Sequence, residues 1–169
     1  MTCVCNKTLE HIVTSCVMSH LEENDNLYSL QHAFCKNRSC KIQLLEFVTK
    51  LIDIKQNIKQ TDVIVIDCWK AFNKVPHNRL LLKPKYYGIR NNTLGCLKNF
   101  LNNWQQCVVV DGEHSASVPV LSGVSQGSVI SLALFLIYIN DLPNSIKYKV
   151  RLFADDTIMY LAINNNDDC

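Results

Sequence analysis

The sequence predicts an α+β fold, and three observations support this class. A β-branched run at 61–67 predicts a strand, and residues 149–163 predict a strand, a turn and a second strand. Between and around them lie stretches with helical periodicity. These helices and strands are interleaved without regular βαβ alternation, which favours a mixed fold over a parallel sheet. At 169 residues the chain fits a single domain.

Composition restricts the class of protein. The chain is 48% hydrophobic and 19% charged, which indicates a globular protein, and its net charge of +2 is too weak to name a partner. The longest apolar run, 129–139, is far shorter than the roughly 20 residues of a membrane span, so we expect no membrane partner. The first residues lack a basic segment followed by an apolar one, so we expect no signal peptide, and the nine cysteines show no paired zinc spacing. We therefore expect an intracellular protein, in the nucleus or the cytoplasm.

The first half of the chain predicts two helices, a loop and a strand. Residues 7–22 share an apolar face and predict a helix, whereas 29–39 are polar and basic and predict a loop. Ser39 is placed to cap a second helix, whose apolar side carries Leu44, Phe47, Val48, Leu51 and Ile58. The continuous run at 61–67 predicts a strand that is buried on both faces.

The middle of the chain predicts helices followed by a hairpin. A helix is expected to begin near His77, and Pro84 should kink it or stop it early. Residues 93–104 again show helical periodicity. Residues 105–123 predict two strands joined at an Asp111-Gly112 turn.

Two adjacent carboxylates, Asp155 and Asp156, interrupt the apolar segment "RLFADDTIMYL" at 151–161. One interpretation is a simple turn, because aspartate favours turns and two in a hairpin loop need no function. However, like charges beside an apolar surface repel each other, and a bound divalent cation would remove that penalty. Hard oxygen ligands of this kind suit Mg²⁺.

Asp67 is the best candidate for a third carboxylate at the same place. It closes the apolar run "VIVID", but it lies 88 positions before Asp155. Only a fold that sets the two strands side by side would bring these residues together. Three carboxylates at the edge of a sheet could hold two metal ions about 4 Å apart, as in polymerases and nucleases.

The segment 69–110 carries positive charge without any aspartate or glutamate. Its seven cations are Lys70, Lys74, Arg79, Lys83, Lys85, Arg90 and Lys98. An ordinary solvated helix face would explain some of them, but such faces usually mix charges of both signs. One-sided charge near a strand that carries carboxylates favours a polyanion such as a nucleic-acid backbone.

A glycine- and serine-rich loop, "SGVSQGS" at 122–128, precedes a long apolar stretch at 127–142 that predicts a buried helix. Glycine allows a backbone to approach a ligand closely, and a helix N-terminus favours phosphate or sugar oxygens. A plain entry into a helix explains the same loop equally well.

Taken together, four segments in order carry a family resemblance. They are "QHAFCKNRSC", "VIVIDCWKAFNKVPH", "SGVSQGSVISLALFLIYINDLP" and "FADD". The chain resembles the reverse transcriptase domain of non-LTR (LINE-type, jockey-like) retrotransposons over nearly its whole length. It departs from the usual motifs at several positions, namely Ala33, Cys35, Cys68, Asn73, Ser125, Ser131 and Leu132.

The resemblance implies a fold and an activity. The fold would be a fingers and palm fragment of a right-hand polymerase, with an antiparallel palm sheet, packed helices and no thumb. Residues 1–60 would belong to the fingers, and 61–169 mainly to the palm with some fingers, as one partial domain. The activity would be RNA-directed DNA polymerisation by two-metal nucleotidyl transfer. The alternative is a truncated, diverged and inactive remnant with at most weak RNA binding.

The resemblance also implies catalytic roles. Asp67, Asp155 and Asp156 would be the catalytic residues and the ligands of Mg²⁺, with Mn²⁺ as a possible substitute. One ion would activate the primer 3′-hydroxyl, and the other would neutralise the triphosphate. The partners would be an RNA template, a DNA primer and deoxynucleoside triphosphates. The oligomeric state is not determined by the sequence.

Five further residues would contact the nucleotide by the same resemblance. Phe72 would lie under the sugar and exclude a 2′-hydroxyl, although a core phenylalanine explains it as well. Gln126 would contact the nucleotide, and Gly127 would let the backbone approach it. Arg38, together with Lys36, would reach the triphosphate through its bidentate guanidinium group.

Overall fold

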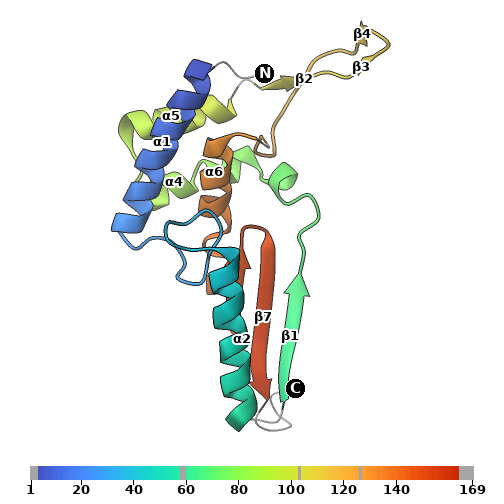
Figure 1. Cartoon of the computed structure of the whole chain (residues 1–169). Coiled ribbons are helices and arrows are strands. Elements are labelled where there is room, and N and C mark those ends of the chain that lie inside the picture. The colour runs from blue at the N-terminus through green and yellow to red at the C-terminus, as the bar shows by residue number, and fades with distance from the viewer. Residues whose placement is uncertain (1–3, 58–59, 103, 126, 164–169) are drawn as a thin grey trace. The chain divides into compact units, whose positions relative to one another are not determined.

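The chain divides into two compact units. The computed structural model describes residues 4–57, 60–102, 104–125 and 127–163. The sheet unit comprises 27–69 and 139–169, and the helical unit comprises 1–26 and 70–138. Figure 1 shows their helices and strands. Mixed helices and antiparallel sheets agree with the predicted α+β class.

The sheet unit is built on three antiparallel strands in the order β1-β7-β6. Their bounds are β1 Gln60–Ile66, β6 Lys149–Phe153 and β7 Asp156–Ile163. Figure 1 shows β7 beside β1. Ile66 pairs with Thr157, and Phe153 pairs with Asp156 across a tight turn. The predicted strand-turn-strand at 149–163 is thus confirmed, and the strand predicted at 61–67 pairs with it.

Helix α2 (Cys40–Asn57) packs against this sheet. Ser39 caps it as predicted, because its Oγ accepts a hydrogen bond from the Ile42 N–H at 3.2 Å. Phe47 contacts Tyr160 of β7 edge to face, with ring centroids 5.4 Å apart. Of the predicted apolar side, Phe47 and Leu51 are half-buried, Leu44 and Val48 stay exposed, and Ile58 lies outside the described residues.

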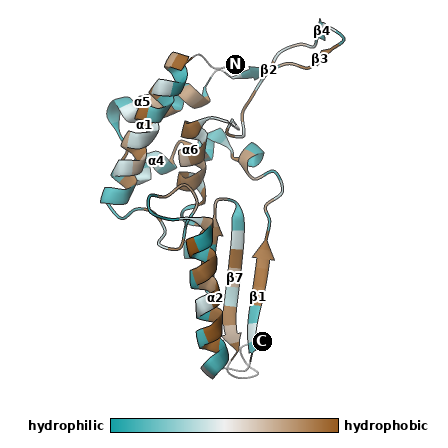
Figure 2. Cartoon of the chain, viewed as in Figure 1, coloured by the Kyte–Doolittle hydropathy of each residue, from teal (hydrophilic) through white to brown (hydrophobic). Residues whose placement is uncertain are grey.

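The prediction that strand 61–67 is buried on both faces is wrong. Strand β1 is at the edge of the sheet and pairs only with β7 among the described strands. Its apolar side chains are exposed, and Val65 reaches 70%. Figure 2 shows β1 as a largely hydrophobic strand. An uncovered apolar edge strand is a site for aggregation, so the unit is expected to be poorly soluble by itself.

The helical unit contains α1 (Val4–Glu23), α5 (Asn91–Leu101) and α6 (Val129–Ile139). Helix α6 is the buried helix predicted from the apolar stretch at 127–142. Its fully buried side chains include Leu134, Phe135, Leu136 and Ile137. Its burial on most sides follows from its sequence, because it is apolar all round. Among the helices in the described ranges, none has the length and hydrophobicity to cross a membrane.

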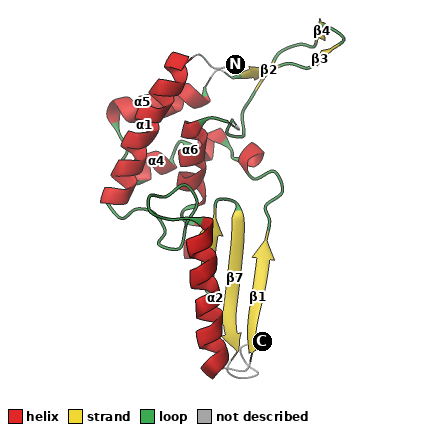
Figure 3. Cartoon of the chain, in the orientation of Figure 1, coloured by secondary structure: helices red, strands yellow, loops and turns green. Residues whose placement is uncertain are grey.

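Short elements complete the helical unit, as the colouring of Figure 3 shows. The 3₁₀ turn η1 is Phe72–Lys74, and the short helices are α3 His77–Leu80 and α4 Lys83–Tyr86. The sheet unit has one such turn in its described residues, η2, at Leu142–Ser145. Pro84 lies in the first turn of α4, so the helix that begins at His77 stops early as predicted.

The predicted hairpin at 105–123 is present as a broken ribbon. Strand β2 (Gln105–Gln106) pairs with β5 (Val118–Pro119), and β3 (Val109–Val110) pairs with β4 (Glu113–His114). Asp111 and Gly112 form the tip, both with positive φ, as the sequence predicts for a tight turn.

Candidate active site

The three predicted catalytic aspartates lie at one end of the sheet. Asp67 directly follows Ile66, the last residue of β1, whose partner in β7 is Thr157. Asp156 is the residue before Thr157 and opens β7, and Asp155 lies in the turn before it. Figure 1 shows β1 ending where the β6–β7 turn lies. The antiparallel pairing therefore closes the gap of 88 positions between these residues.

The side chains at this end of the sheet differ in exposure. Asp67 and Asp156 are exposed, and Asp155 is half-buried. Ala154, the residue before the pair, has φ = 55°, a left-handed conformation that is uncommon without glycine. Strain of this kind persists only where the surroundings hold it.

The three carboxylates fit a divalent cation in chemistry and in backbone position. Hard oxygen ligands at the open edge of a sheet are what Mg²⁺ takes, and it keeps water or phosphate oxygens as further ligands. Within the described ranges, however, no three His, Cys, Asp or Glu side chains form a group that could hold a metal. The fit is therefore one of chemistry and of backbone position, not of side chains already gathered around an ion.

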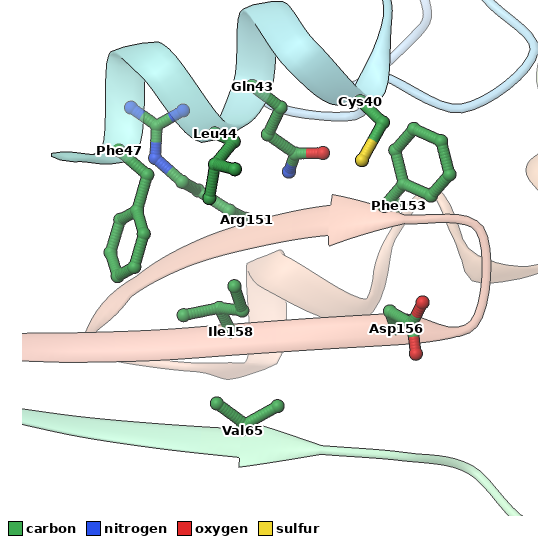
Figure 4. A pocket seen from close by; sticks show the side chains of 9 residues that line it. All are labelled: Cys40, Gln43, Leu44, Phe47, Val65, Arg151, Phe153, Asp156 and Ile158. Carbon is green, nitrogen blue, oxygen red and sulfur yellow. The ribbon is translucent and has the colours of Figure 1, made fainter.

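A pocket of about 270 Å³ opens beside Asp156, between α2 and the sheet. Figure 4 shows Phe153, the partner of Asp156 in β6, near that carboxylate, whereas Gln43 and Arg151 lie further along the pocket. Arg151 is 6% exposed, and its Nη1 donates to Glu46 Oε2 at 3.0 Å. The lining is mainly apolar, so one face of the acidic end lies beside a hydrophobic wall.

In the helical unit, Phe72 is joined to the glycine-rich loop. The Val124 N–H donates to Phe72 O at 2.9 Å, and the Gly123 N–H donates to Val75 O at 2.8 Å. His77 Nε2 donates to Gly123 O at 2.6 Å. These bonds fix the loop at 121–124 against the segment at 72–77, so the motif that contains Phe72 and the one that contains Gly127 are held together.

The ring of Phe72 stacks on Phe135 of α6, with centroids 4.0 Å apart and an angle of 20° between the planes. Phe135 is buried, whereas Phe72 is half-buried. One face of the Phe72 ring is therefore accounted for by packing on the core. The rest of the side chain stays accessible. The predicted contact with a sugar remains a prediction.

Gly127 adopts φ = 95°, and a Cβ atom added there would meet no atom within 4 Å. The position therefore needs a left-handed backbone but has open space beside it, as expected where a backbone approaches a ligand. Gln126, the other residue predicted here, lies outside the described residues.

The N-terminus of α6 is bound by a carboxylate of the chain itself. Glu10 Oε2 of α1 accepts from Ser128 Oγ at 2.7 Å and from the Val129 N–H at 3.2 Å. The sequence predicts phosphate or sugar oxygens at this helix terminus, but Glu10 occupies the first free N–H. The reason is physical, since an internal anion satisfies the helix terminus as well as a ligand does.

Glu10→Ala is expected to lower the free energy of unfolding by about 1.5–3 kcal/mol, because two donors at a helix terminus lose a charged acceptor. Urea denaturation measures this. Glu23→Ala, on the exposed end of the same helix, is the matched control and should stay within about 0.5 kcal/mol of the parent chain. An equal loss in both variants would mean that Glu10 does not stabilise α6.

Arg38 is engaged within the sheet unit. Its Nη1 donates to the backbone oxygens of Tyr28, Ser29 and Gln31, at 3.2, 2.9 and 2.6 Å. In this structure it therefore fixes the loop before α2, while Lys36 is exposed. The role predicted for both at a triphosphate remains a prediction.

Most cations of the basic segment 69–110 point to solvent in the helical unit. The exposed ones include Arg79, Lys85 and Arg90. Lys83 differs, because its Nζ donates to Tyr138 O and lies 4.8 Å from the centre of that ring. The prediction that this segment meets a nucleic-acid backbone remains a prediction.

Sequence analysis missed one residue in each unit. In the helical unit Glu10 binds the start of α6, and in the sheet unit Gln31 binds the turn that carries Asp155, both across long sequence separations. Glu10 lies on an ordinary polar helix face and Gln31 in a polar loop, so periodicity does not distinguish either from a solvated residue.

Comparison with known proteins identifies the family. A family model described as reverse transcriptase (RNA-dependent DNA polymerase) matches residues 2–167. The RNA-directed DNA polymerase from mobile element jockey of Drosophila melanogaster is 25% identical over 89% of this chain. The probable RNA-directed DNA polymerase from transposon BS of the same species is 25% identical over 94%.

A third relative comes from a different retrotransposable element and a different species. The retrovirus-related Pol polyprotein from type-1 retrotransposable element R2 of Popillia japonica is 29% identical over 70% of this chain. The matches span only 17%, 18% and 21% of these three relatives. Because the family model covers nearly every residue, the chain belongs to the reverse transcriptase (RNA-dependent DNA polymerase) family.

Proposed function

We propose that this chain carries the catalytic centre of an RNA-directed DNA polymerase of a non-LTR retrotransposon. One observation carries the proposal. Strand β1 pairs with β7 in a register that brings Asp67, the residue after β1, to the turn that carries Asp155 and Asp156. In a chain of the reverse transcriptase family, carboxylates at this end of an antiparallel sheet suit two-metal nucleotidyl transfer. The three strands β1, β7 and β6 would belong to the palm, and the residues before 61 to the fingers.

Asp67, Asp155 and Asp156 would hold the divalent ions, Mg²⁺ or Mn²⁺. When bound, the ions would activate the primer hydroxyl and neutralise the triphosphate. The chain itself supplies position, because phosphoryl transfer asks for little covalent chemistry from the protein. Exposed Asp67 and Asp156 are accessible to ligands from solvent, and half-buried Asp155 is the more constrained of the three.

In the helical unit, Phe72 and Gly127 would contact the incoming deoxynucleotide, together with Gln126. The bonded loop at 121–124 fixes Phe72, and the space beside Gly127 admits a ligand. Arg38 and Lys36 would meet the triphosphate; Arg38 would do so with the nitrogens that its loop contacts leave available. The template RNA and the DNA primer would lie along exposed cations of the basic segment. The reaction would take place inside the cell.

Primer extension on poly(rA)–oligo(dT) tests this function. The chain is expected to add deoxythymidine residues when Mg²⁺ or Mn²⁺ is present and none when a chelator is added. Asp155→Ala should lower the rate by at least about 100-fold, because each lost 1.36 kcal/mol of transition-state stabilisation costs a factor of ten.

Extension that survives in Asp155→Ala would show a contaminating polymerase. No extension by the parent chain at any concentration of either metal would contradict the proposal and favour the alternative, a catalytically inactive member of the family. Filter binding of poly(rA) then measures whether that member still binds RNA.

A further inference from the structure

Gln31 connects the loop before α2 to the acidic turn. Its side chain is 2% exposed, and its Oε1 accepts from the Ala33 N–H at 2.9 Å and from the Ala154 N–H at 3.2 Å. Both partners are donors, so the amide orientation is determined, with the oxygen toward the turn. The Gln31 amide nitrogen has no hydrogen-bond partner in the part of the chain that the structure describes. The oxygen alone therefore carries the contact.

Ala154 is the residue through which Gln31 would act. It is the first residue of the turn between β6 and β7, has φ = 55°, and directly precedes Asp155. The strand before it is fixed to the same loop, because the His32 N–H donates to Leu152 O and the Leu152 N–H donates to Leu30 O, both at 3.1 Å. The loop thus offers a rigid support, from which the Gln31 oxygen reaches the strained turn.

We propose that Gln31 is a positioning residue, which holds Ala154 so that the carboxylates of Asp155 and Asp156 leave the turn in the orientation that shares a metal ion. The proposal rests on the function proposed above. Its physical reason is that a left-handed alanine persists only when its surroundings fix it. Loss of the acceptor leaves two buried N–H groups without a partner, and the turn is then free to rearrange.

Gln43 is a matched control. It is 7% exposed, and its Nε2 donates to Leu152 O of β6 at 3.1 Å. Gln31 and Gln43 therefore both make buried hydrogen bonds to this hairpin, but only Gln31 binds the turn. Methionine matches glutamine in length and removes the polar group, so Gln31→Met and Gln43→Met separate a positioning effect from a general loss of stability.

The experiment measures the full chain by two methods that need no catalysis. Amide exchange of Ala154 is followed by NMR, and Mn²⁺ affinity is followed by electron paramagnetic resonance with the metal alone. In Gln31→Met we expect Ala154 to exchange about tenfold faster and Mn²⁺ to bind about tenfold more weakly. Both values should stay within about twofold of the parent chain in Gln43→Met. Gln31→Glu, which keeps an acceptor oxygen, should restore most of both.

Equal effects of Gln31→Met and Gln43→Met would overturn the proposal, and so would a Gln31→Glu variant that behaves like Gln31→Met. If Gln31→Met does not fold, Gln31→Asn replaces it, since the shorter side chain cannot reach both donors. Where the parent chain extends primers, kcat should fall in Gln31→Met with an unchanged KM for the nucleotide. If the parent chain extends none, the proposed function fails, and amide exchange of Ala154 together with Mn²⁺ affinity still decides the role of Gln31.

Discussion

Asp67→Ala is expected to lower Mg²⁺-dependent primer extension by at least about 100-fold, although Asp67 lies outside the acidic doublet in sequence. The reason is the register of β1 on β7, which ends with Asp67 beside the turn that carries Asp155 and Asp156. Single-nucleotide extension on poly(rA)–oligo(dT) over a range of Mg²⁺ concentrations measures the effect. Because Asp67 is exposed, its removal should shift the melting temperature by no more than about 2 °C.

Asp62→Ala is the matched control for this prediction. Asp62 lies on the same strand and is also exposed, but it pairs with Leu161 at the other end of β7. Its replacement should leave extension within about twofold of the parent chain. Equal activities for Asp67→Ala and Asp62→Ala would exclude the end of β1 from the site.

A double substitution tests whether the aspartates act together. If Asp67 and Asp155 hold the same ions, either single change already removes the metal, and Asp67→Ala with Asp155→Ala should lose no more activity than the worse single variant. Additive losses would mean two independent roles.

The acidic end of the sheet was predictable because its signals are local. Each carboxylate closes or interrupts an apolar run, and a charge in that place is costly without a function. The pairing of β1 with β7 could not be predicted from the residues of either apolar run alone. It was expected from the resemblance, and the register of β1 on β7 agrees with it.

The burial of β1 was the clearest error, and its cause is general. A continuous β-branched run fits the centre of a sheet, but the same residues also form an edge strand when no second neighbour is present. Helix α6 was predicted correctly because an all-round apolar helix has only one stable place, the core. Patterns thus determine the type of element, whereas the neighbours of β1 depend on the rest of the fold.

Glu10 and Gln31 show a second limit of the sequence. Each uses one carbonyl or carboxylate oxygen to satisfy backbone N–H groups more than 115 residues away. No spacing rule connects such partners, because a polar side chain in a loop or on a helix is ordinarily solvated. Arg38 gives the opposite case, since its charge suggested a ligand and the structure gives it backbone oxygens of its own loop.

Gly123→Ala is expected to cause the largest loss of stability of any glycine substitution in the described chain, about 2–6 kcal/mol. Gly123 has φ = 91°, which alanine adopts only at a cost of about 1–3 kcal/mol. An added Cβ would also lie 2.9 Å from Asn73 O and 3.1 Å from Asn73 Cα. These are backbone atoms that cannot move aside as a side chain would, so overpacking adds about 1–3 kcal/mol.

Two other glycines separate these causes. Gly127 shares the positive φ but has open space, so Gly127→Ala should lose only the conformational part, about 1–3 kcal/mol. Gly95 lies inside α5 with neither constraint, so Gly95→Ala should gain about 0.5–1 kcal/mol from helix propensity. Urea denaturation of the three variants measures the order, and a loss in Gly123→Ala no larger than in Gly127→Ala would contradict the close approach to Asn73.

The conformation of the loop at Gly123 should also affect which nucleotide the chain selects, because this loop holds Phe72 in place. The Val124 N–H bonds Phe72 O directly, and the Gly123 N–H bonds Val75 O three residues further on. If an alanine pushes this loop away from Asn73, the Phe72 ring loses its fixed position on Phe135. In an active chain, Gly123→Ala should therefore also weaken the preference for deoxynucleotides over ribonucleotides, whereas Gly95→Ala should leave it unchanged. A destabilised variant that keeps its full preference would show that Phe72 does not contact the sugar.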